Sequence, residues 1–442
     1  MRVGFVSCSP TPYREFVPLA RFLAERGHDP LFVAPHDIAL DPDLRVARYR
    51  AVHYRNSALH DVAELLRLRA TIDAIIAREA PDVLVLNRDR GADVLECARR
   101  AALRVGAPVV AMDVGITSAA FKARTRRSQR HDARRGVSRV VPLLWPGQQR
   151  VVDGDPLLFY PPGKTAALAL FALLPQHPWI NGENGAHAHM MISGRSLDEA
   201  RADGARCDNA VVVGLPSIDT LYAAHRERDA IAAELIAAHF GGRRNGKRLC
   251  VFPLPQLFEH KLMNREHALD EIEAVLAAAE RTNQLLIVGS LHPTMDRTHY
   301  QHLERAHPDF ALATSPLSRV MAAADLSINA FPTTVSWSLL VGAPAVFLDW
   351  FEQGYRLDHQ PGCVVSRDRS RLTEQLLSTL ACADELRVAI RSDVALLPPF
   401  DGRCKERAMQ VLLDASASRR ALGDERGGAA RRGASVLATV SR

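Results

Sequence analysis

The sequence predicts an α/β protein made of two Rossmann-like domains with a central cleft between them. Short, nearly continuous apolar runs alternate with stretches of helical periodicity, which is the pattern of parallel sheets covered by helices on both faces. The alternation occurs twice, before and after an irregular stretch rich in proline and glycine. The length of 442 residues also exceeds what one hydrophobic core usually organises, so at least two domains are expected.

The first α/β series starts at the amino terminus. RVGFVSC at residues 2–8 predicts a strand, the turn-prone SPTP follows it, and REFVPLARFLAERGHD predicts a helix that ends at Gly27. PLFVAP predicts a second strand, and PDVLVLNRD predicts a third after a helix near residues 62–79. ADVLECARRAALRVG and APVVAMDVG then repeat helix and strand. Strands this apolar are expected inside a parallel sheet.

The middle of the chain is irregular, from about residue 120 to 185. It contains WPGQQ, LLFYPPGK and LLPQHPWINGENG. A long irregular stretch within a compact protein is usually either functional or mobile. We expect this insertion to recognise the acceptor of a transferred group.

A second series follows. HMMISGRSLDEARADGARCDNAVVVGLPSID predicts strand, helix and strand, GGRRNGKR predicts a hinge, and KRLCVFPLP, QLLIVGSLHP and PAVFLDW predict further strands between helices. The expected organisation is an amino-terminal domain over 1–190 with an irregular insertion at 120–185, a carboxyl-terminal domain over 191–415, and a basic flexible tail over 416–442. Ligands of such folds bind beyond the carboxyl ends of the parallel strands, so the cleft is the expected site.

Composition narrows the functional class. No apolar run reaches the roughly 18 residues that a membrane span requires, and no export signal is recognised at the amino terminus. The seven cysteines are scattered and include no CxxC pair, so neither a disulfide framework nor a zinc site is expected, and the expected compartment is the cytoplasm. No DxD acid pair follows a predicted strand, so no metal is predicted.

The net charge of +6 is unevenly distributed. Much of the excess lies in KARTRRSQRHDARRGVSR at residues 122–139 and in the tail. Such a run is usually a solvated loop. The functional alternatives are binding of a phosphate-rich acceptor, such as an anionic polysaccharide or lipid-linked intermediate, and peripheral contact with an anionic inner membrane. Nucleic acid is not expected as a partner, because no recognition motif or stacking aromatic residues accompany the charge.

Three segments resemble the GT-B glycosyltransferase superfamily, in the branch that contains UDP-sugar 2-epimerases and bacterial capsule and teichoic-acid transferases. PLARFLAERGH is similar to the first βα unit of that branch, VVVGLPSIDTL to its interdomain signature with Gly214, Pro216, Ile218 and Asp219, and LLIVGSLHP followed by LVGAPAVFLD to its nucleotide-binding half. The resemblance implies a GT-B fold and a nucleotide-sugar substrate, linked to CMP or UDP, with no separate cofactor. It also implies that Gly214 lies near the nucleotide.

On the nucleotide side, His292 ends a predicted strand, where an imidazole can donate to a phosphate oxygen as the nucleotide leaves. The resemblance gives this role to the histidine of a His-Pro pair, here His292 and Pro293. A strand-end histidine bonded to a backbone carbonyl is the structural alternative. Related proteins place a Lys or Arg for the diphosphate after the first strand of this half, where this chain offers Lys261.

Thr333 and Thr334 are expected to precede the helix VSWSLLVG, so that their hydroxyls and the first-turn N–H groups bind a phosphate. An ordinary threonine N-cap is the alternative. The resemblance implies a Glu in this helix that holds the nucleotide ribose. Here the chain departs from the family, because that position falls on Ser336 or Trp337.

On the acceptor side, Asp89 closes VLVLNRD and Asp113 closes VVAMDVG. If the two carboxylates approach each other, crowding or burial would raise one pKa toward the range of a general base. The 2-epimerases are similar in having an acid at both positions, although each aspartate can instead cap the next helix. Arg14, at the start of the first helix, is a candidate for a phosphate or an acceptor carboxylate, and Glu183 and His187 are candidates for chemistry on the acceptor.

The first hypothesis is a nucleotide-sugar-dependent glycosyltransferase of bacterial cell-surface polysaccharide synthesis, such as capsule or lipopolysaccharide. A base would assist an acceptor hydroxyl, on a saccharide or lipid-linked molecule, in attacking the donor. One alternative is a UDP-sugar 2-epimerase, which the two aspartates favour, although FPLPQLFEHK stands where that family has Thr-x-His-Arg-x-Glu-Asn. The other is a catalytically silent nucleotide-sugar-binding protein.

Overall fold

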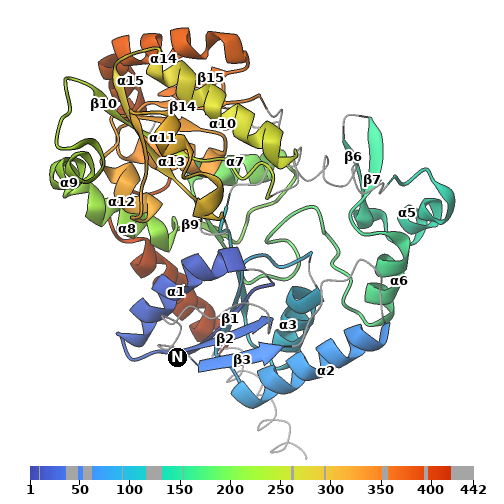
Figure 1. Cartoon of the computed structure of the whole chain (residues 1–442). Coiled ribbons are helices and arrows are strands. Elements are labelled where there is room, and N and C mark those ends of the chain that lie inside the picture. The colour runs from blue at the N-terminus through green and yellow to red at the C-terminus, as the bar shows by residue number, and fades with distance from the viewer. Residues whose placement is uncertain are drawn as a thin grey trace, which may run out of the picture.

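The computed structural model describes most of the chain. It covers residues 1–8, 10–35, 48–52, 62–91, 93–115, 132–152, 154–259, 263–292, 295–350, 357–392 and 397–419. Within these residues two parallel sheets form the centres of two α/β halves, and an insertion projects from the first half (Figure 1).

The first half is built on a seven-stranded sheet in the order β3-β2-β1-β4-β5-β8-β9, with every neighbouring pair parallel. Its strands are β1 (Arg2–Val6), β2 (Asp29–Pro35), β3 (Arg48–Val52), β4 (Val83–Leu86), β5 (Val109–Met112), β8 (Ala188–Met191) and β9 (Ala210–Val212). Its helices are α1 (Pro10–Ala24), α2 (Val62–Glu79), α3 (Asp93–Arg104) and α7 (Gly194–Ala202). The helix α1 begins inside the predicted turn SPTP, so the loop after β1 is shorter than expected.

Both faces of this sheet are buried, as the continuous apolar runs predict. In β4, Leu84 and Leu86 belong to the hydrophobic cluster that α2 and α3 cover. Val83 and Val85 belong to a second cluster, which contains residues of α1. Successive side chains of a strand point to opposite faces, so VLVL supplies both layers of the core from four residues.

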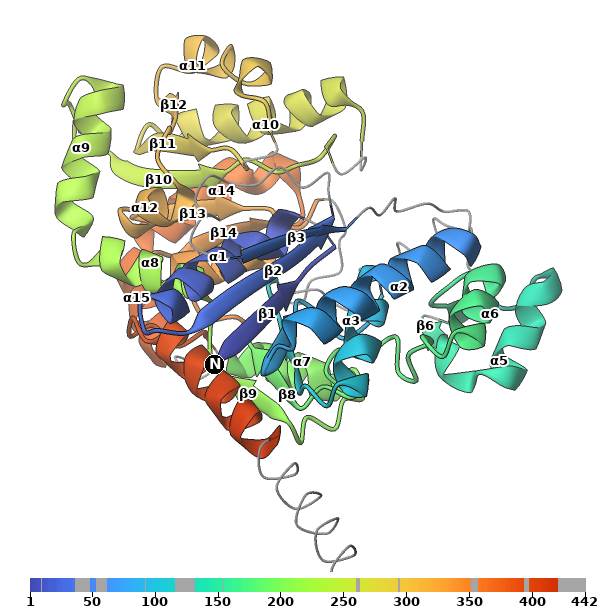
Figure 2. The ribbon, with the colours of Figure 1, turned by 90° about the horizontal axis from the view of Figure 1, so that it is seen from below.

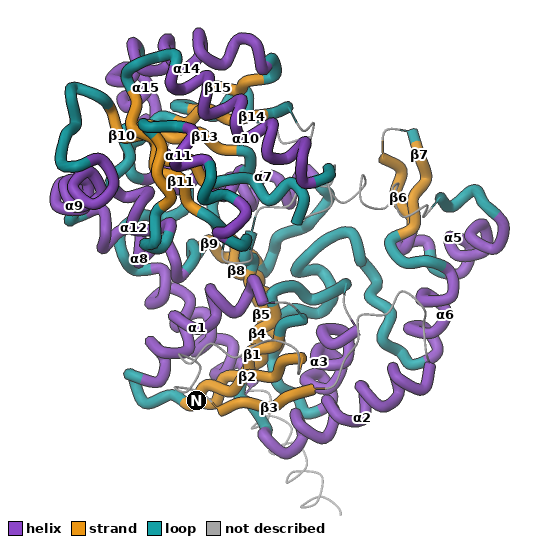
Figure 3. The backbone as a smooth tube through the Cα atoms, in the orientation of Figure 1, coloured by secondary structure: helices purple, strands orange, loops and turns teal. Residues whose placement is uncertain are grey.

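The second half contains a six-stranded parallel sheet in the order β12-β11-β10-β13-β14-β15. Figure 3 colours its strands orange. Its strands are β10 (Arg248–Pro253), β11 (Leu285–Ser290), β12 (Phe310–Leu312), β13 (Leu326–Asn329), β14 (Ala345–Leu348) and β15 (Cys363–Ser366). Its helices are α8 (Pro216–His225), α9 (Arg228–Phe240), α10 (Arg265–Glu280), α11 (Leu303–Ala306), α12 (Leu317–Ala322), α13 (Pro332–Leu340), α14 (Leu372–Ala381) and α15 (Ala383–Ser392).

The insertion contains more regular structure than its composition predicts. The 3₁₀ turn η2 (Gly136–Val140), the short helix α5 (Val141–Leu144) and the 3₁₀ turn η3 (Pro146–Gln148) lead into an antiparallel hairpin of β6 (Gln149–Val152) and β7 (Asp155–Leu158), followed by α6 (Pro162–Leu170). It has a small core of its own, formed by Ala133, Val141 and Leu158. Figure 2 shows the insertion extending from the side of the first half that carries α2 and α3.

The sheet topology moves the expected domain boundary. The strands β8 and β9 join the first sheet, so that sheet extends to residue 212, beyond the expected domain end at residue 190. The helix over residues 404–419 also leaves the second half, because Cys404 and Leu412 are buried in the same cluster as Val3 and Phe5 of β1. The chain therefore crosses between the halves twice. The tail beyond residue 419 lies outside the described residues.

Within the described ranges, no helix is both long enough and apolar enough to cross a membrane.

Candidate functional site

Two of the predicted residues, 278 positions apart in the sequence, meet between the halves. Arg14 lies in the second turn of α1, and His292 lies just beyond β11. Arg14 Nη1 is 3.2 Å from His292 Nε2. A guanidinium group only donates, so His292 Nε2 is the acceptor and its proton is assigned to Nδ1. The contact brings a cation to the strand end where the sequence predicts a phosphate.

The amino end of α13 differs from the prediction by one turn. Phe331 is the N-cap residue and Pro332 occupies the first helical position, so Thr333 and Thr334 lie inside the first turn and not before it. Thr334 Oγ1 donates to the Phe331 carbonyl at 2.8 Å, which turns this hydroxyl toward the chain itself. No side chain caps the helix within the described residues. The backbone N–H groups of this turn, rather than the threonine hydroxyls, are the groups suited to an anion.

The positions of the expected ribose-binding acid are occupied differently. Ser336 Oγ donates to the Pro332 carbonyl of its own helix at 3.3 Å. Trp337 Nε1 is buried and has no hydrogen-bond partner among the described residues. Asn329, at the end of β13, is fully buried, and its Nδ2 donates to Ser327 Oγ at 2.6 Å. Its Oδ1 likewise has no hydrogen-bond partner among the described residues. Neither Ser336 nor Trp337 supplies a carboxylate.

Asp113 follows β5 and forms the outer member of a carboxylate–imidazole pair. Its Oδ1 is 3.1 Å from His189 Nε2 and accepts a hydrogen bond from Asn181 Nδ2 at 2.8 Å. The His189 side chain is only 4% exposed, whereas that of Asp113 is 20% exposed. Burial alone would lower the pKa of His189, but the Asp113 charge and hydrogen bond outweigh burial and raise the pKa. A protonated His189 would hold Asp113 ionised and in a fixed direction.

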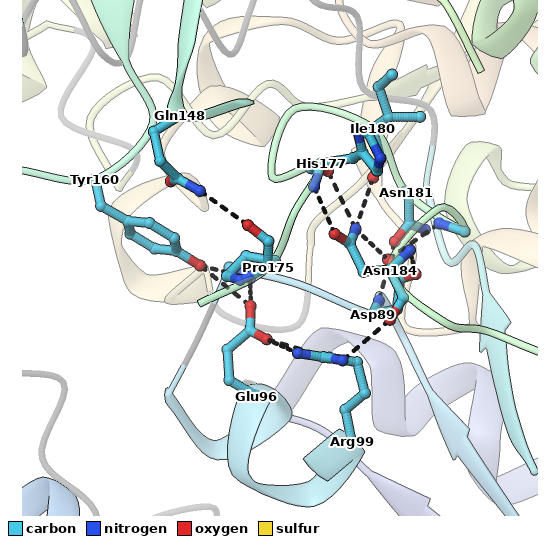
Figure 4. A network of polar contacts seen from close by, with 12 residues as sticks. Asp89, Glu96, Arg99, Gln148, Tyr160, Pro175, His177, Ile180, Asn181 and Asn184 are labelled. Atoms are coloured by element: carbon cyan, nitrogen blue, oxygen red, sulfur yellow. Dashed lines mark hydrogen bonds and ion pairs between the residues drawn. The ribbon is translucent and has the colours of Figure 1, made fainter. Parts of the chain in front are cut away.

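Asp89 does not pair with Asp113. It is fully buried, and its carboxylate accepts hydrogen bonds from Gly182 N at 3.0 Å, Asn184 N at 2.7 Å and Asn184 Nδ2 at 3.3 Å (Figure 4). Its own N–H donates to Asn181 Oδ1 at 3.0 Å. Asp89 therefore holds the loop that carries Asn181 in place. This geometry argues against the catalytic role predicted for it.

Glu183 and His187 are also placed differently from the prediction. Glu183 accepts hydrogen bonds from the backbone N–H groups of Arg206 at 2.9 Å and Cys207 at 3.3 Å. Burial opposes ionisation, but these bonds and the Arg206 charge lower the Glu183 pKa. His187 precedes β8, and its N–H donates to Val109 O at 2.6 Å. It therefore lies at the amino ends of β5 and β8, the edge opposite to the strand ends that bind ligands.

Gly214 serves the crossing between the halves. It has a φ of +85°, and a Cβ atom there would lie 2.5 Å from Cys404 Sγ. Asp219 of the same signature accepts hydrogen bonds from the N–H groups of Cys404 at 2.8 Å and Lys405 at 3.0 Å, so it caps the helix over 404–419. The signature that predicted nucleotide contact by Gly214 is thus used to pack this helix.

A buried network ties the insertion to the first sheet (Figure 4). The Oε1 atom of Glu96, in α3, accepts hydrogen bonds from Gly91 N at 3.0 Å and Tyr160 Oη at 3.2 Å. Arg99 donates to Glu96 Oε2 at 3.3 Å and to the Asn184 carbonyl at 3.1 Å. Burial raises the pKa of Glu96 to about 7, against the effect of the Arg99 charge. The network fixes the loop around Asn184 from a second side.

The remaining predicted residues, Lys261 and Pro293, lie outside the described residues. Within the described part of the chain, no group of three or more His, Cys, Asp or Glu side chains is arranged to hold a metal ion. The residues that sequence reasoning missed are His189 and Asn181. In the sequence, His189 looks like any other residue of the strand AHMM, and Asn181 is one of several polar residues in its loop.

Solved structures share this fold. The UDP-GlcNAc 2-epimerase from Neisseria meningitidis, bound to UDP-GlcNAc, aligns with 94% of this chain and 100% of its own at 11% identity and a TM-score of 0.55. A glycosyltransferase from Rickettsia africae aligns with 94% of this chain and 98% of its own at 10% identity and a TM-score of 0.55. The calicheamicin glycosyltransferase CalG4 aligns with 97% of this chain and 98% of its own at 15% identity and a TM-score of 0.54.

No protein-family model matches the chain, and no curated protein sequence matches it. The structural similarities confirm the predicted GT-B fold, with two Rossmann-like halves. The structures that share it are enzymes of the glycosyltransferase and 2-epimerase class. At these identities the likeness concerns the fold, and the activity has to be argued from the site.

Proposed function

We propose that this protein is a nucleotide-sugar-dependent glycosyltransferase that joins a sugar to an acceptor hydroxyl in the synthesis of a bacterial cell-surface polysaccharide. The observation that carries the proposal is the contact of Arg14 with His292, which places a cation of the first half at a strand end of the second. A leaving nucleotide diphosphate needs such charge where the bond to the sugar breaks. The first-turn backbone N–H groups of α13 would supply further donors.

In the proposed reaction Asp113 takes the proton of the acceptor hydroxyl. The acceptor oxygen then forms a bond to the anomeric carbon, and the bond from that carbon to the phosphate oxygen breaks with its electron pair on the nucleotide. His189 and Asn181 act as positioning residues, since they hold Asp113 and do not need to touch the substrate. Arg14 and His292 stabilise the negative charge on the departing nucleotide.

A uridine diphosphate donor is the first choice, because the related epimerase structure is bound to UDP-GlcNAc. A CMP-linked donor and a saccharide or lipid-linked acceptor remain part of the proposal. The 2-epimerase alternative rested on two neighbouring aspartates, and the hydrogen bonds of Asp89 to the loop at 182–184 weaken it. The third candidate function is that of a catalytically silent nucleotide-sugar-binding protein.

A panel of UDP- and CMP-sugars separates the three functions when free nucleotide and sugar configuration are both measured. A transferase releases nucleotide as acceptor is added, an epimerase changes only the sugar, and a silent binder does neither. Arg14→Ala and His292→Ala should each weaken nucleotide binding, measured by calorimetry. Arg21→Ala, on the same helix, is the control. Binding that is equally strong in all variants would contradict the proposed phosphate site.

A further inference from the structure

The insertion displays an aliphatic stripe on its outer surface. Of the twelve large apolar side chains exposed within the described residues, six lie between residues 137 and 170. Four of these form the stripe along η2 and α5: Val137 is 73% exposed, Val140 48%, Leu143 82% and Leu144 61%. Their spacing of three to four residues repeats once per helical turn, so they share one side of this short element.

The element is anchored on its other side, which fixes the direction of the stripe. Val141 is 3% exposed and packs in the small core of the insertion with Ala133 and Leu158. The stripe therefore points outward because of the fold, and no further part of the described chain covers it. In Figures 1 and 2, α5 lies at the outer end of the molecule, on the side away from the second sheet.

Arginines flank the aliphatic stripe. Arg134, Arg135 and Arg139 have exposed side chains. Asp132 is paired with Arg134 at 3.2 Å and Arg135 at 3.5 Å, and Arg134 also pairs with Asp155 of the adjoining hairpin at 3.2 Å. With Asp155 counted, three positive charges stand against two negative charges, so the surface around the stripe keeps a positive excess. Aliphatic side chains that protrude among arginines are the arrangement of elements that lie in the interface of an anionic bilayer.

We propose that η2 and α5 dock the protein on an anionic lipid surface, with the aliphatic stripe inserted between the headgroups and the arginines against lipid phosphates. The charge excess favours lipid over a second copy of the chain, since two such surfaces would bring like charges together. The basic residues 122–131 lie outside the described residues and are not part of this site. The inference does not rest on the proposed function, because lipid binding is measured with no nucleotide sugar present.

Flotation of the full chain with lipid vesicles tests the proposal. One set of vesicles is phosphatidylcholine alone, and the other includes a minority of phosphatidylglycerol. The wild-type protein should float with the anionic vesicles, less with the neutral ones, and less as salt is added. The double variant Leu143→Ser and Leu144→Ser should reduce the affinity for anionic vesicles by about tenfold or more, since two leucines lose their insertion.

Two matched controls separate this site from a general surface effect. Val137→Ser should weaken vesicle binding, whereas Val388→Ser, at a valine of α15 that is 65% exposed, should not. Arg135→Gln should weaken binding to anionic vesicles by about fivefold, the usual effect of one arginine at a membrane surface. Arg201→Gln should leave it unchanged, although Arg201 is likewise exposed and paired with an aspartate three residues earlier.

Three results would overturn the proposal. The first is wild-type protein that floats with neither kind of vesicle. The second is equal loss of binding in the stripe variants and in their controls. The third is a concentration-dependent dimer, seen by light scattering, that the Leu143→Ser and Leu144→Ser variant abolishes without any effect on lipid binding. That last result would make the aliphatic stripe an interface between copies of the chain.

Discussion

Replacing Asp89 by asparagine distinguishes a residue that fixes a loop from a catalytic base. The two carboxylate oxygens of Asp89 face only donors, namely the N–H groups of Gly182 and Asn184 and the Asn184 side-chain amide. Asparagine has one oxygen in place of two. Whichever way its amide group turns, its NH₂ will face an N–H that has lost its acceptor.

The magnitude follows from the burial of this site. A buried donor left without an acceptor costs about 1–3 kcal/mol, and more when the lost acceptor was charged. Asp89 is 0% exposed, so water cannot replace the lost oxygen without opening the loop. We expect Asp89→Asn to lower the free energy of unfolding of the first half by about 3 kcal/mol.

Urea unfolding measures the overall loss, and hydrogen exchange of the Gly182 and Asn184 amides measures the local one. Asp198→Asn, in α7 of the same half, is the control, because its side chain is 60% exposed and its loss should cost less than about 1 kcal/mol of stability. If Asp89→Asn unfolds at the wild-type urea concentration, with unchanged exchange at both amides, and yet loses nucleotide-sugar turnover, Asp89 is catalytic and our assignment is wrong.

Three further outcomes are expected. Asp113→Asn should lower kcat for nucleotide release by about 10²–10⁴-fold, the usual contribution of a general base, with nearly unchanged nucleotide Kd; a parallel loss of affinity would make Asp113 a binding residue. Gly214→Ala places a methyl group 2.5 Å from Cys404 Sγ at a positive φ, and should lower the free energy of unfolding in urea by about 2–4 kcal/mol. Adding Cys404→Ala should restore part of this stability, and a double variant that restores none would contradict the contact. The His189 pKa is raised in the fold, since Asp113 outweighs burial, so its stabilisation is complete below the ordinary histidine value of about 6.5 and is lost as pH rises through the raised pKa. The difference in unfolding free energy between wild type and His189→Gln should shrink along that rise, and a difference that grows with pH would refute the pairing.

The sequence predicted the α/β class well because the signal is local. An apolar run such as VLVL between stretches of helical periodicity indicates a strand buried on both faces, which is typical of parallel sheets. The boundary at residue 190 was wrong because strand pairing is long-range. AHMM and AVV look like the start of a new series, and nothing in their composition tells which sheet they join.

The place of His292 just beyond β11 was predictable, because the end of that strand can be recognised in the sequence. Arg14 and His292 were both singled out, but their contact depends on how the two halves pack. The misplacement of Thr333 was avoidable, since Pro332 favours the first position of a helix and places the threonine within the first turn. The pairing of Asp113 with His189 could not be predicted, because in the sequence His189 looks like a core residue of its strand.

The helix over residues 404–419 joins the two halves as a second tether. The chain passes between the halves once near Gly214 and again before Cys404, and these two passages touch each other. Because the two connections meet at one point, they form a common pivot, and opening or closing of the halves would be a rotation about this point. A chain cut before residue 397 would lose one of the two connections and also expose apolar side chains of β1 and α1 that the helix covers.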